Sequence, residues 1–173
     1  MKLIFISGLA GIDKETLVDL ALQRSGRKND FAVIDFDKIG SLADEIGDIP
    51  DMEAVRRVAS RFYEKLEKTL ITSLKGQRGD IIVNGYLTFA TKHGYVRAIP
   101  DEFFRSFKPD TLVILEKADD LIAKDDAAIE HQKINRYYAS IYASAAGSAL
   151  KIIKFRDRKM IDSVKELSEL LKQ

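Results

Sequence analysis

Five short apolar runs recur along the chain, and longer stretches with helical periodicity separate them. The runs cover residues 2–7, 31–36, 80–84, 110–116 and 150–155. Each is five to seven residues long and mostly apolar, which is typical of strands buried on both faces of a parallel sheet. We therefore expect five parallel strands.

Helical patterns fill the intervals. The clearest covers residues 52–74, where apolar side chains recur every three or four positions, namely Val55, Val58, Phe62, Leu66, Leu70 and Leu74. Other helices are expected at 14–24, 41–46, 100–107 and 160–171, with one or two between 118 and 146 and a loop over 85–98. Strands alternating with helices predict an α/β fold, a five-stranded parallel sheet with helices on both faces. We expect a single domain over residues 1–173.

The composition excludes several classes of site. The chain has no cysteine, so disulfides, thiolate metal sites and a cysteine nucleophile are excluded, and two histidines argue against a His-rich metal site. The net charge of +1 gives no general attraction to nucleic acid or to anionic membranes. No apolar run approaches the roughly 20 residues that span a bilayer, and the N-terminus has no cleavable signal pattern. We expect a cytoplasmic protein.

A glycine-containing segment, "GLAGIDKET", covers residues 8–16 directly after the first apolar run. A phosphate-binding loop needs glycines for the turn, a lysine that reaches the phosphates and a hydroxyl that helps to hold Mg²⁺. Gly8, Gly11, Lys14 and Thr16 fit this pattern. The strict pattern fails twice, because Asp13 stands where it has a glycine and Glu15 stands where it has a serine or threonine. In a parallel sheet, this segment, Asp37, the loop after Gly85 and residues 155–158 meet at the carboxyl ends of the strands.

Three further segments match a known family. "GYVRAIP" at 94–100, "EHQKINR" at 130–136 and "KIIKFRD" at 151–157 occur in the order and with the character of segments in archaeal-type adenylate kinases. The chain resembles that family over nearly its whole length. The resemblance implies a P-loop nucleoside monophosphate kinase fold and phosphoryl transfer from ATP to AMP or a related nucleoside monophosphate. It also suggests a homo-oligomer.

The resemblance implies a set of site residues. Lys14 and Arg136 would be catalytic, Thr16 would contact Mg²⁺, and the nucleotide would contact Gly8, Ala10, Gly11, Lys14, Thr16, Tyr95 and Gln132. ATP and Mg²⁺ would be the cofactors, and ATP and AMP the partners.

The chain departs from the family where phosphates bind. Asp13 and Glu15 replace small loop residues, and a carboxylate about 5 Å from a phosphate charge costs roughly 3 kcal/mol at an effective dielectric of about 20. Asn84 and Tyr86 replace an acid and a histidine, and Phe155 and Arg158 alter the segment expected around adenine. The stretch between the fourth run and "EHQ", where the family has several arginines, contains none. An arginine finger can contribute about 10³–10⁵ in rate. The activity is therefore expected to be weak or lost.

Several alternatives stay open. Lys14 either binds phosphate or belongs to a vestigial turn between strand and helix. Asp13 and Glu15 either stabilise the helix start or bind a cation or a cationic partner. His131 and Asn135, four residues apart, fit a polar seam between helix and sheet as well as a ligand site. The whole chain is either an adenylate-kinase-like enzyme or a non-catalytic module that acts through a nucleotide or protein partner. Nucleic-acid binding through "RSGRK" or "KFRDRK" is the weakest alternative, because such runs usually form solvated faces.

Overall fold

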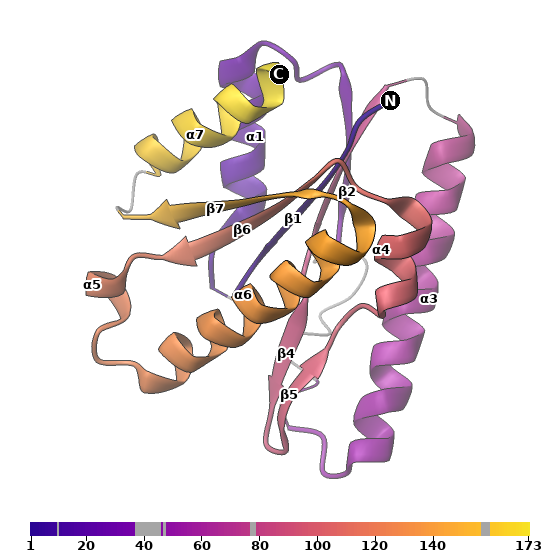
Figure 1. Ribbon diagram of the computed structural model, residues 1–173, viewed down its shortest axis with the longest axis vertical. Coiled ribbons are helices and arrows are strands. Elements are labelled where there is room, and N and C mark those ends of the chain that lie inside the picture. Colours follow the sequence, from indigo (N-terminus) through magenta and orange to yellow (C-terminus); the bar gives the residue numbers. More distant parts are fainter. Residues whose placement is uncertain (10, 37–45, 47, 77–78, 157–159) are drawn as a thin grey trace.

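The computed structural model describes residues 1–9, 11–36, 46, 48–76, 79–156 and 160–173. Five parallel strands form the central layer. The strands are β1 (Leu3–Gly8), β2 (Phe31–Asp35), β3 (Asp80–Gly85), β6 (Thr111–Lys117) and β7 (Ala149–Phe155). Their order in the sheet is β2-β3-β1-β6-β7 (Figure 1). The five-stranded parallel sheet expected from the sequence is confirmed.

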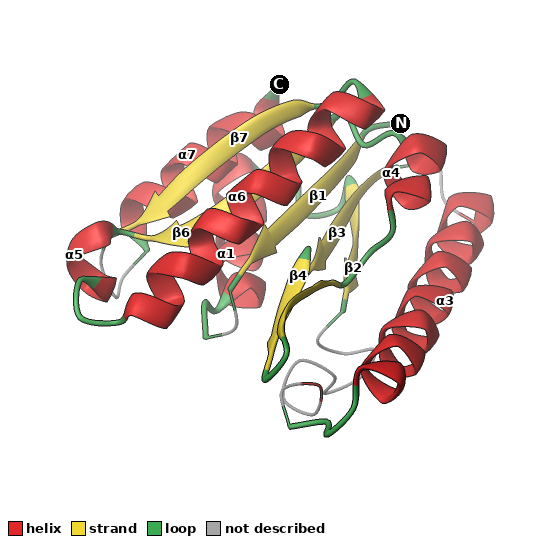
Figure 2. Cartoon of the chain, turned by 60° about the horizontal axis from the view of Figure 1, so that its bottom comes forward, coloured by secondary structure: helices red, strands yellow, loops and turns green. Residues whose placement is uncertain are grey.

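Helices cover both faces of the sheet. On one face lie α1 (Lys14–Ser25) and α7 (Ile161–Lys172), which pack against each other. The other face carries α3 (Met52–Gly76), α4 (Asp101–Phe107) and α6 (Asp126–Ala146), and the one-turn helix α5 (Asp119–Ile122) joins β6 to α6 (Figure 2). The region expected to hold one or two helices therefore holds two. The helix expected over 41–46 and the residue Asp37 lie outside the described residues, apart from Ile46.

The alternation of side chains along β1 explains the three layers. Leu3 and Phe5 pack with the helices α3, α4 and α6, whereas Ile4 and Ile6 pack with α1 and α7. All four side chains are buried. Successive residues of a strand point to opposite faces, so an uninterrupted apolar run can bury itself only between two helical layers.

One sequence expectation is wrong. Residues 85–98, expected as a loop, contain an antiparallel hairpin of β4 (Thr88–Thr91) and β5 (Gly94–Arg97). Each strand is only four residues long, and the segments "TFAT" and "GYVR" are too short to show a periodic pattern. The hairpin continues the chain from β3 and carries Tyr95 toward α6, as the contacts described below show.

A tight contact lies where β3 ends. The ring of Phe36, directly after β2, packs against the backbone of Gly85, and a β-carbon added to Gly85 would lie 2.1 Å from that ring. Phe36 is itself enclosed by Phe5 and Phe62, with ring centroids 6.2 and 4.8 Å away. The core around the ends of β2 and β3 therefore requires glycine at position 85.

We expect Gly85→Ala to lower the free energy of unfolding by about 1–3 kcal/mol, because the added methyl group must displace the buried ring of Phe36. Chemical denaturation would measure the change. Gly76→Ala is the matched control, because in the described part of the chain no atom outside its own helix lies within 4 Å of an added β-carbon there. Equal stabilities of the two variants would contradict the contact.

Candidate functional site

The loop between β1 and α1 makes a close turn. A β-carbon on Gly8, the last residue of β1, would lie 3.0 Å from the carbonyl oxygen of Leu115 in β6. Gly11 has a φ of 81°, a conformation that residues with a β-carbon rarely adopt. The two glycines therefore serve the backbone path that a phosphate cradle requires. Ala10, also expected to contact nucleotide, lies outside the described residues.

The acid Asp13 caps the helix that follows the loop. Its carboxylate accepts a hydrogen bond of 3.1 Å from the backbone N–H of Thr16, and Lys14 is the first residue of α1. The N–H of Lys14 donates to the carbonyl of Ile12 at 2.8 Å. Glu15 lies in the first helical turn, at the positive end of the helix dipole. The helix-stabilising interpretation of Asp13 agrees with this geometry.

Lys14 is buried, with only 2% of its surface exposed. The Nζ atom lies 3.9 Å from the centroid of the Tyr86 ring, which follows β3. A cation above an aromatic face is stabilised electrostatically. The lysine expected to reach the phosphates thus lies at the start of α1, directly after the loop, and its side chain points to Tyr86 on the β3 side. Thr16 is exposed.

A buried carboxylate lies beside Asn84, where the sequence indicated a missing acid. Asn84 Nδ2 donates to Asp35 Oδ2 at 3.1 Å, and the two residues pair in register at the ends of β3 and β2. Asn84 Oδ1 is buried and has no hydrogen-bond partner among the described residues. Sequence reasoning missed Asp35, although its place as the final residue of an apolar strand was the signal available.

Polar side chains of α6 hold the end of β6. The guanidinium of Arg136 forms two hydrogen bonds with the carboxylate of Glu116, which is 1% exposed. The Gln132 side chain accepts from the backbone N–H of Lys117 at 2.7 Å and donates to the carbonyl of the same residue at 3.1 Å. Arg136 and Gln132, expected at the phosphates and the nucleotide, therefore already have intramolecular partners in the structure.

A second set of α6 side chains contacts the hairpin. The hydroxyl of Thr88 donates to Asn135 Oδ1 at 2.5 Å and lies 2.9 Å from His131 Nε2. The rings of His131 and Tyr95 are 4.9 Å apart, and the Tyr95 hydroxyl donates to Glu130 at 3.1 Å. Burial lowers the pKa of His131, and its hydrogen bond with Thr88 partly opposes this effect. These contacts agree with the polar seam expected for His131 and Asn135.

A cavity of about 390 Å³ lies between α3 and β5. Tyr95 and Arg97 line it from the hairpin, and Arg56 and Tyr63 line it from α3. Burial, followed by the hydrogen bond to Glu67, raises the pKa of Tyr63 to about 12. Desolvation and Glu130 raise the pKa of Tyr95. Both phenols are therefore protonated donors at neutral pH, beside two arginines.

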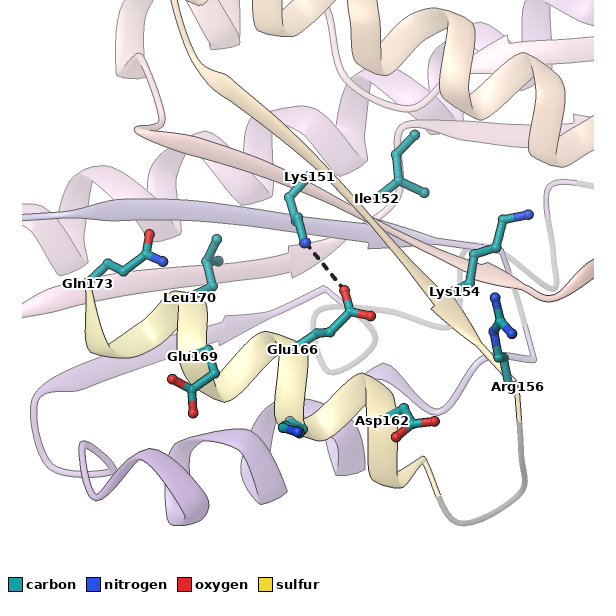
Figure 3. A pocket seen from close by; sticks show the side chains of 10 residues that line it. Lys151, Ile152, Lys154, Arg156, Asp162, Glu166, Glu169, Leu170 and Gln173 are labelled. Carbon is teal, nitrogen blue, oxygen red and sulfur yellow. Dashed lines mark ion pairs between the residues drawn. The ribbon is translucent and has the colours of Figure 1, made fainter.

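A larger cavity, of about 750 Å³, lies at the sheet edge between β7 and α7. Lys151, Lys154 and Arg156 extend from or just beyond β7, and carboxylates extend from α7 (Figure 3). Lys151 pairs with Glu166 at 3.3 Å. No described residue of the β1–α1 loop lines this cavity, and charges of both signs do, so its size does not make it the candidate site. Arg158 lies outside the described residues.

The described residues offer neither a metal-binding cluster nor a membrane-spanning helix. Among the described residues, no group of three or more His, Asp or Glu side chains could hold a metal ion. Mg²⁺ commonly binds through one or two protein oxygens together with substrate phosphates, so a dedicated cluster is not needed for it. None of the described helices has both the length and the apolar character of a membrane span.

Comparison with known proteins places the loop in context. Residues 8–135 match the family model described as an AAA domain, AAA_17. The chain belongs to this family. The matched region begins at Gly8, the first glycine of the loop, and ends at Asn135 of α6. It therefore includes the loop, the hairpin and the carboxyl ends of β2, β3, β1 and β6.

Relatives of this AAA-domain chain include adenylate kinases of archaea. That of Thermoplasma acidophilum is 28% identical, with 86% of each chain covered. Those of Pyrococcus furiosus and Methanocaldococcus jannaschii are 26% and 25% identical, with 97% and 99% of this chain and 94% and 98% of theirs covered. The resemblance stated from the sequence is confirmed.

A solved structure supports the fold. A chain from the PezAT chromosomal toxin–antitoxin system of Streptococcus pneumoniae superposes with a TM-score of 0.51 at 15% identity. The match covers 88% of this chain and 68% of that one. At this identity the likeness concerns the fold alone.

We expect Arg136→Met to lower the free energy of unfolding by about 2–3 kcal/mol, because it leaves the buried Glu116 carboxylate without its two hydrogen bonds. The loss stays below the roughly 3–5 kcal/mol of a wholly buried pair, since 47% of the Arg136 side chain is exposed. Chemical denaturation would measure it, with Glu116→Leu/Arg136→Met recovering most of the loss. A single variant as stable as the native chain would contradict a structural role for the pair.

We expect the native chain to lose more stability than His131→Gln as the pH falls from 7 to 5. The depressed pKa of His131 means that the unfolded chain, with a value near 6.5, binds a proton more readily than the folded one. Stability that is present above pH 6.5 is therefore lost as the pH drops below it. Thermal unfolding across this range would test the difference, and His93→Gln, at an exposed position, should follow the native profile.

Proposed function

We propose that the protein transfers a phosphoryl group from ATP to AMP or a related nucleoside monophosphate, at a rate reduced by its own loop acids. The observation that carries the proposal is the loop after the central strand β1. Gly8 and Gly11 allow its backbone path, and Lys14 begins the helix at the position where a phosphate-binding lysine is needed. The archaeal relatives named adenylate kinase support the choice of nucleotides.

Mg²⁺ fits the residues near this loop. The buried Asn84 Oδ1, which has no hydrogen-bond partner among the described residues, is an oxygen acceptor of the kind that hard cations and their waters prefer. The Asp35 carboxylate adjoins it, and the Thr16 hydroxyl lies in the first turn of α1. When bound, Mg²⁺ would neutralise charge on the phosphates. These three side chains would hold it or its waters.

The acceptor nucleotide fits the cavity between α3 and β5. Its volume of about 390 Å³ lies within the range of small-molecule sites, and the Arg56 and Arg97 side chains supply positive charge at its wall. Arg97 is paired with Asp101, so Arg56 has the simpler role of attracting an anion. Tyr95 would contribute its ring or hydroxyl on the hairpin side.

The reaction demands little covalent chemistry from the protein. Phosphoryl transfer depends mainly on positioning the two nucleotides and stabilising charge on the transferring group. Lys14 would supply positive charge from α1. Arg136, which is hydrogen-bonded to Glu116, would have a supporting role at the end of β6. The reduced set of cations agrees with a slow enzyme.

Calorimetric titration with ATP and then AMP, in the presence of Mg²⁺, is the first test. We expect both to bind, Lys14→Met to weaken ATP binding at least a hundredfold, and ADP to form from ATP and AMP at high enzyme concentration. Binding without ADP formation would reject the enzyme and favour the non-catalytic alternative. If the titration shows binding of neither ATP nor AMP, nucleotide binding is rejected altogether.

A second variant tests the loop acids. Asp13→Gly/Glu15→Ser should raise the affinity for ATP at least tenfold, because two negative charges leave the phosphate site. The same change should lower the melting temperature, because the cap on the Thr16 N–H is lost. Glu64→Ser, which removes an exposed charge from α3, is the control. Unchanged affinity in the double variant would show that the acids do not oppose binding.

A further inference from the structure

Lys117 lies beside the loop, although no sequence pattern marks it. It is the last residue of β6, and β6 runs parallel to β1 with Gly8 paired to Leu115. Lys117 therefore stands two residues beyond the end of β1, at the edge of the sheet where the loop begins. Its Nζ atom is 3.9 Å from the position that a β-carbon on Gly11 would occupy. The ammonium group thus lies over the turn of the loop.

The backbone of Lys117 is held from two sides. Gln132 in α6 bonds to both its N–H and its carbonyl, and Lys117 pairs with Phe155 of β7. The next residue, Ala118, donates its N–H to the carbonyl of Phe155 at 2.8 Å. A side chain that starts from so constrained a backbone loses less entropy when it binds a ligand than one on a loose loop.

The ammonium of Lys117 has no hydrogen bond or ion pair within the described part of the chain. Neighbouring cations differ in this respect. Arg136 pairs with Glu116, and Lys154 lies 3.3 Å from Asp119. Lys117 is also partly buried, so its charge is less solvated than that of a fully exposed lysine. A partly buried cation without a carboxylate beside it favours an anion as its partner.

The two lysines near the loop lie on opposite sides of it. Lys14 points to Tyr86, which follows β3, whereas Lys117 extends from β6. Because β1 lies between β3 and β6 in the sheet, the loop that follows β1 has one ammonium group on each flank. This arrangement suits a chain of phosphates, which carries several charges along its length, better than a single compact anion.

We propose that Lys117 binds the phosphates of a nucleoside triphosphate held on the β1–α1 loop and acts as a second phosphate-binding lysine opposite Lys14. The inference rests on the proposed function for the loop itself. It assigns Lys117 a charge that compensates for Asp13 and Glu15, in a chain whose segment 117–135 contains no arginine. The contact is electrostatic, so it depends on the charge and reach of the side chain rather than on its shape.

The test is calorimetric titration of the full chain with ATP and, separately, with inorganic tripolyphosphate. Lys117→Met keeps the length of the side chain and removes the charge, and it should weaken both probes about 10- to 100-fold. Lys117→Arg should retain most of the affinity. Lys68→Met is the matched control, because it removes an exposed lysine from α3 and should bind like the native chain. Thermal unfolding of every variant would confirm that each one folds.

The possible outcomes separate this inference from the proposed function on which it rests. Weakening of both probes in Lys117→Met, with recovery in Lys117→Arg, supports the inference even if no ADP forms, in which case the proposed reaction alone is wrong. Native-like binding by Lys117→Met overturns the inference and leaves the proposed function standing. If neither ATP nor tripolyphosphate binds to the native chain, both the inference and the proposed function are overturned.

Discussion

The pairing of β1 with β3 on one side and β6 on the other constrains every other feature of the site. Parallel hydrogen-bonded strands end at one edge of a sheet, so the residues after β3, β1 and β6 meet there. The close approach of Gly8 to the Leu115 carbonyl fixes where the loop leaves the sheet. Tyr86, the loop and Lys117 then lie in a row across three neighbouring strands. Helix α1 starts from this row and brings Lys14 to it.

Helix α6 stabilises that row through polar contacts. Gln132 and Arg136, four residues apart, bond to the last two residues of β6. His131 and Asn135, again four apart, bond to Thr88 of the hairpin. One face of α6 thus holds the end of β6, and the neighbouring face holds the hairpin of β4 and β5. Side chains with such partners contribute more to placing the site than to direct contact with a ligand.

Much of the fold could be predicted from the sequence, because it is determined by apolar residues that follow a regular pattern over long segments. The five strands and the long helix α3 follow from uninterrupted or regularly spaced apolar residues. The hairpin of β4 and β5 could not be predicted, since four-residue strands are shorter than the window in which alternation can be recognised. The loop residues Gly8, Gly11 and Lys14 were recognisable by motif. Strand register cannot be read from a single sequence. It determines the bond between Arg136 and Glu116, the position of Lys117 and the position of the Asp35 carboxylate.

The cap that Asp13 forms has a consequence for recognition. Its carboxylate is an anion tethered to the same helix start that would receive a phosphate, and it bonds to the Thr16 N–H without help from solution. A tethered group competes at an effective concentration set by its linkage, which for so short a tether lies in the millimolar range or above. A phosphate that bound at this helix start would therefore have to displace the Asp13 carboxylate from the Thr16 N–H. The apparent affinity of any anion for this helix start is thus set partly by the chain's own carboxylate, which occupies the amide whenever the anion is absent.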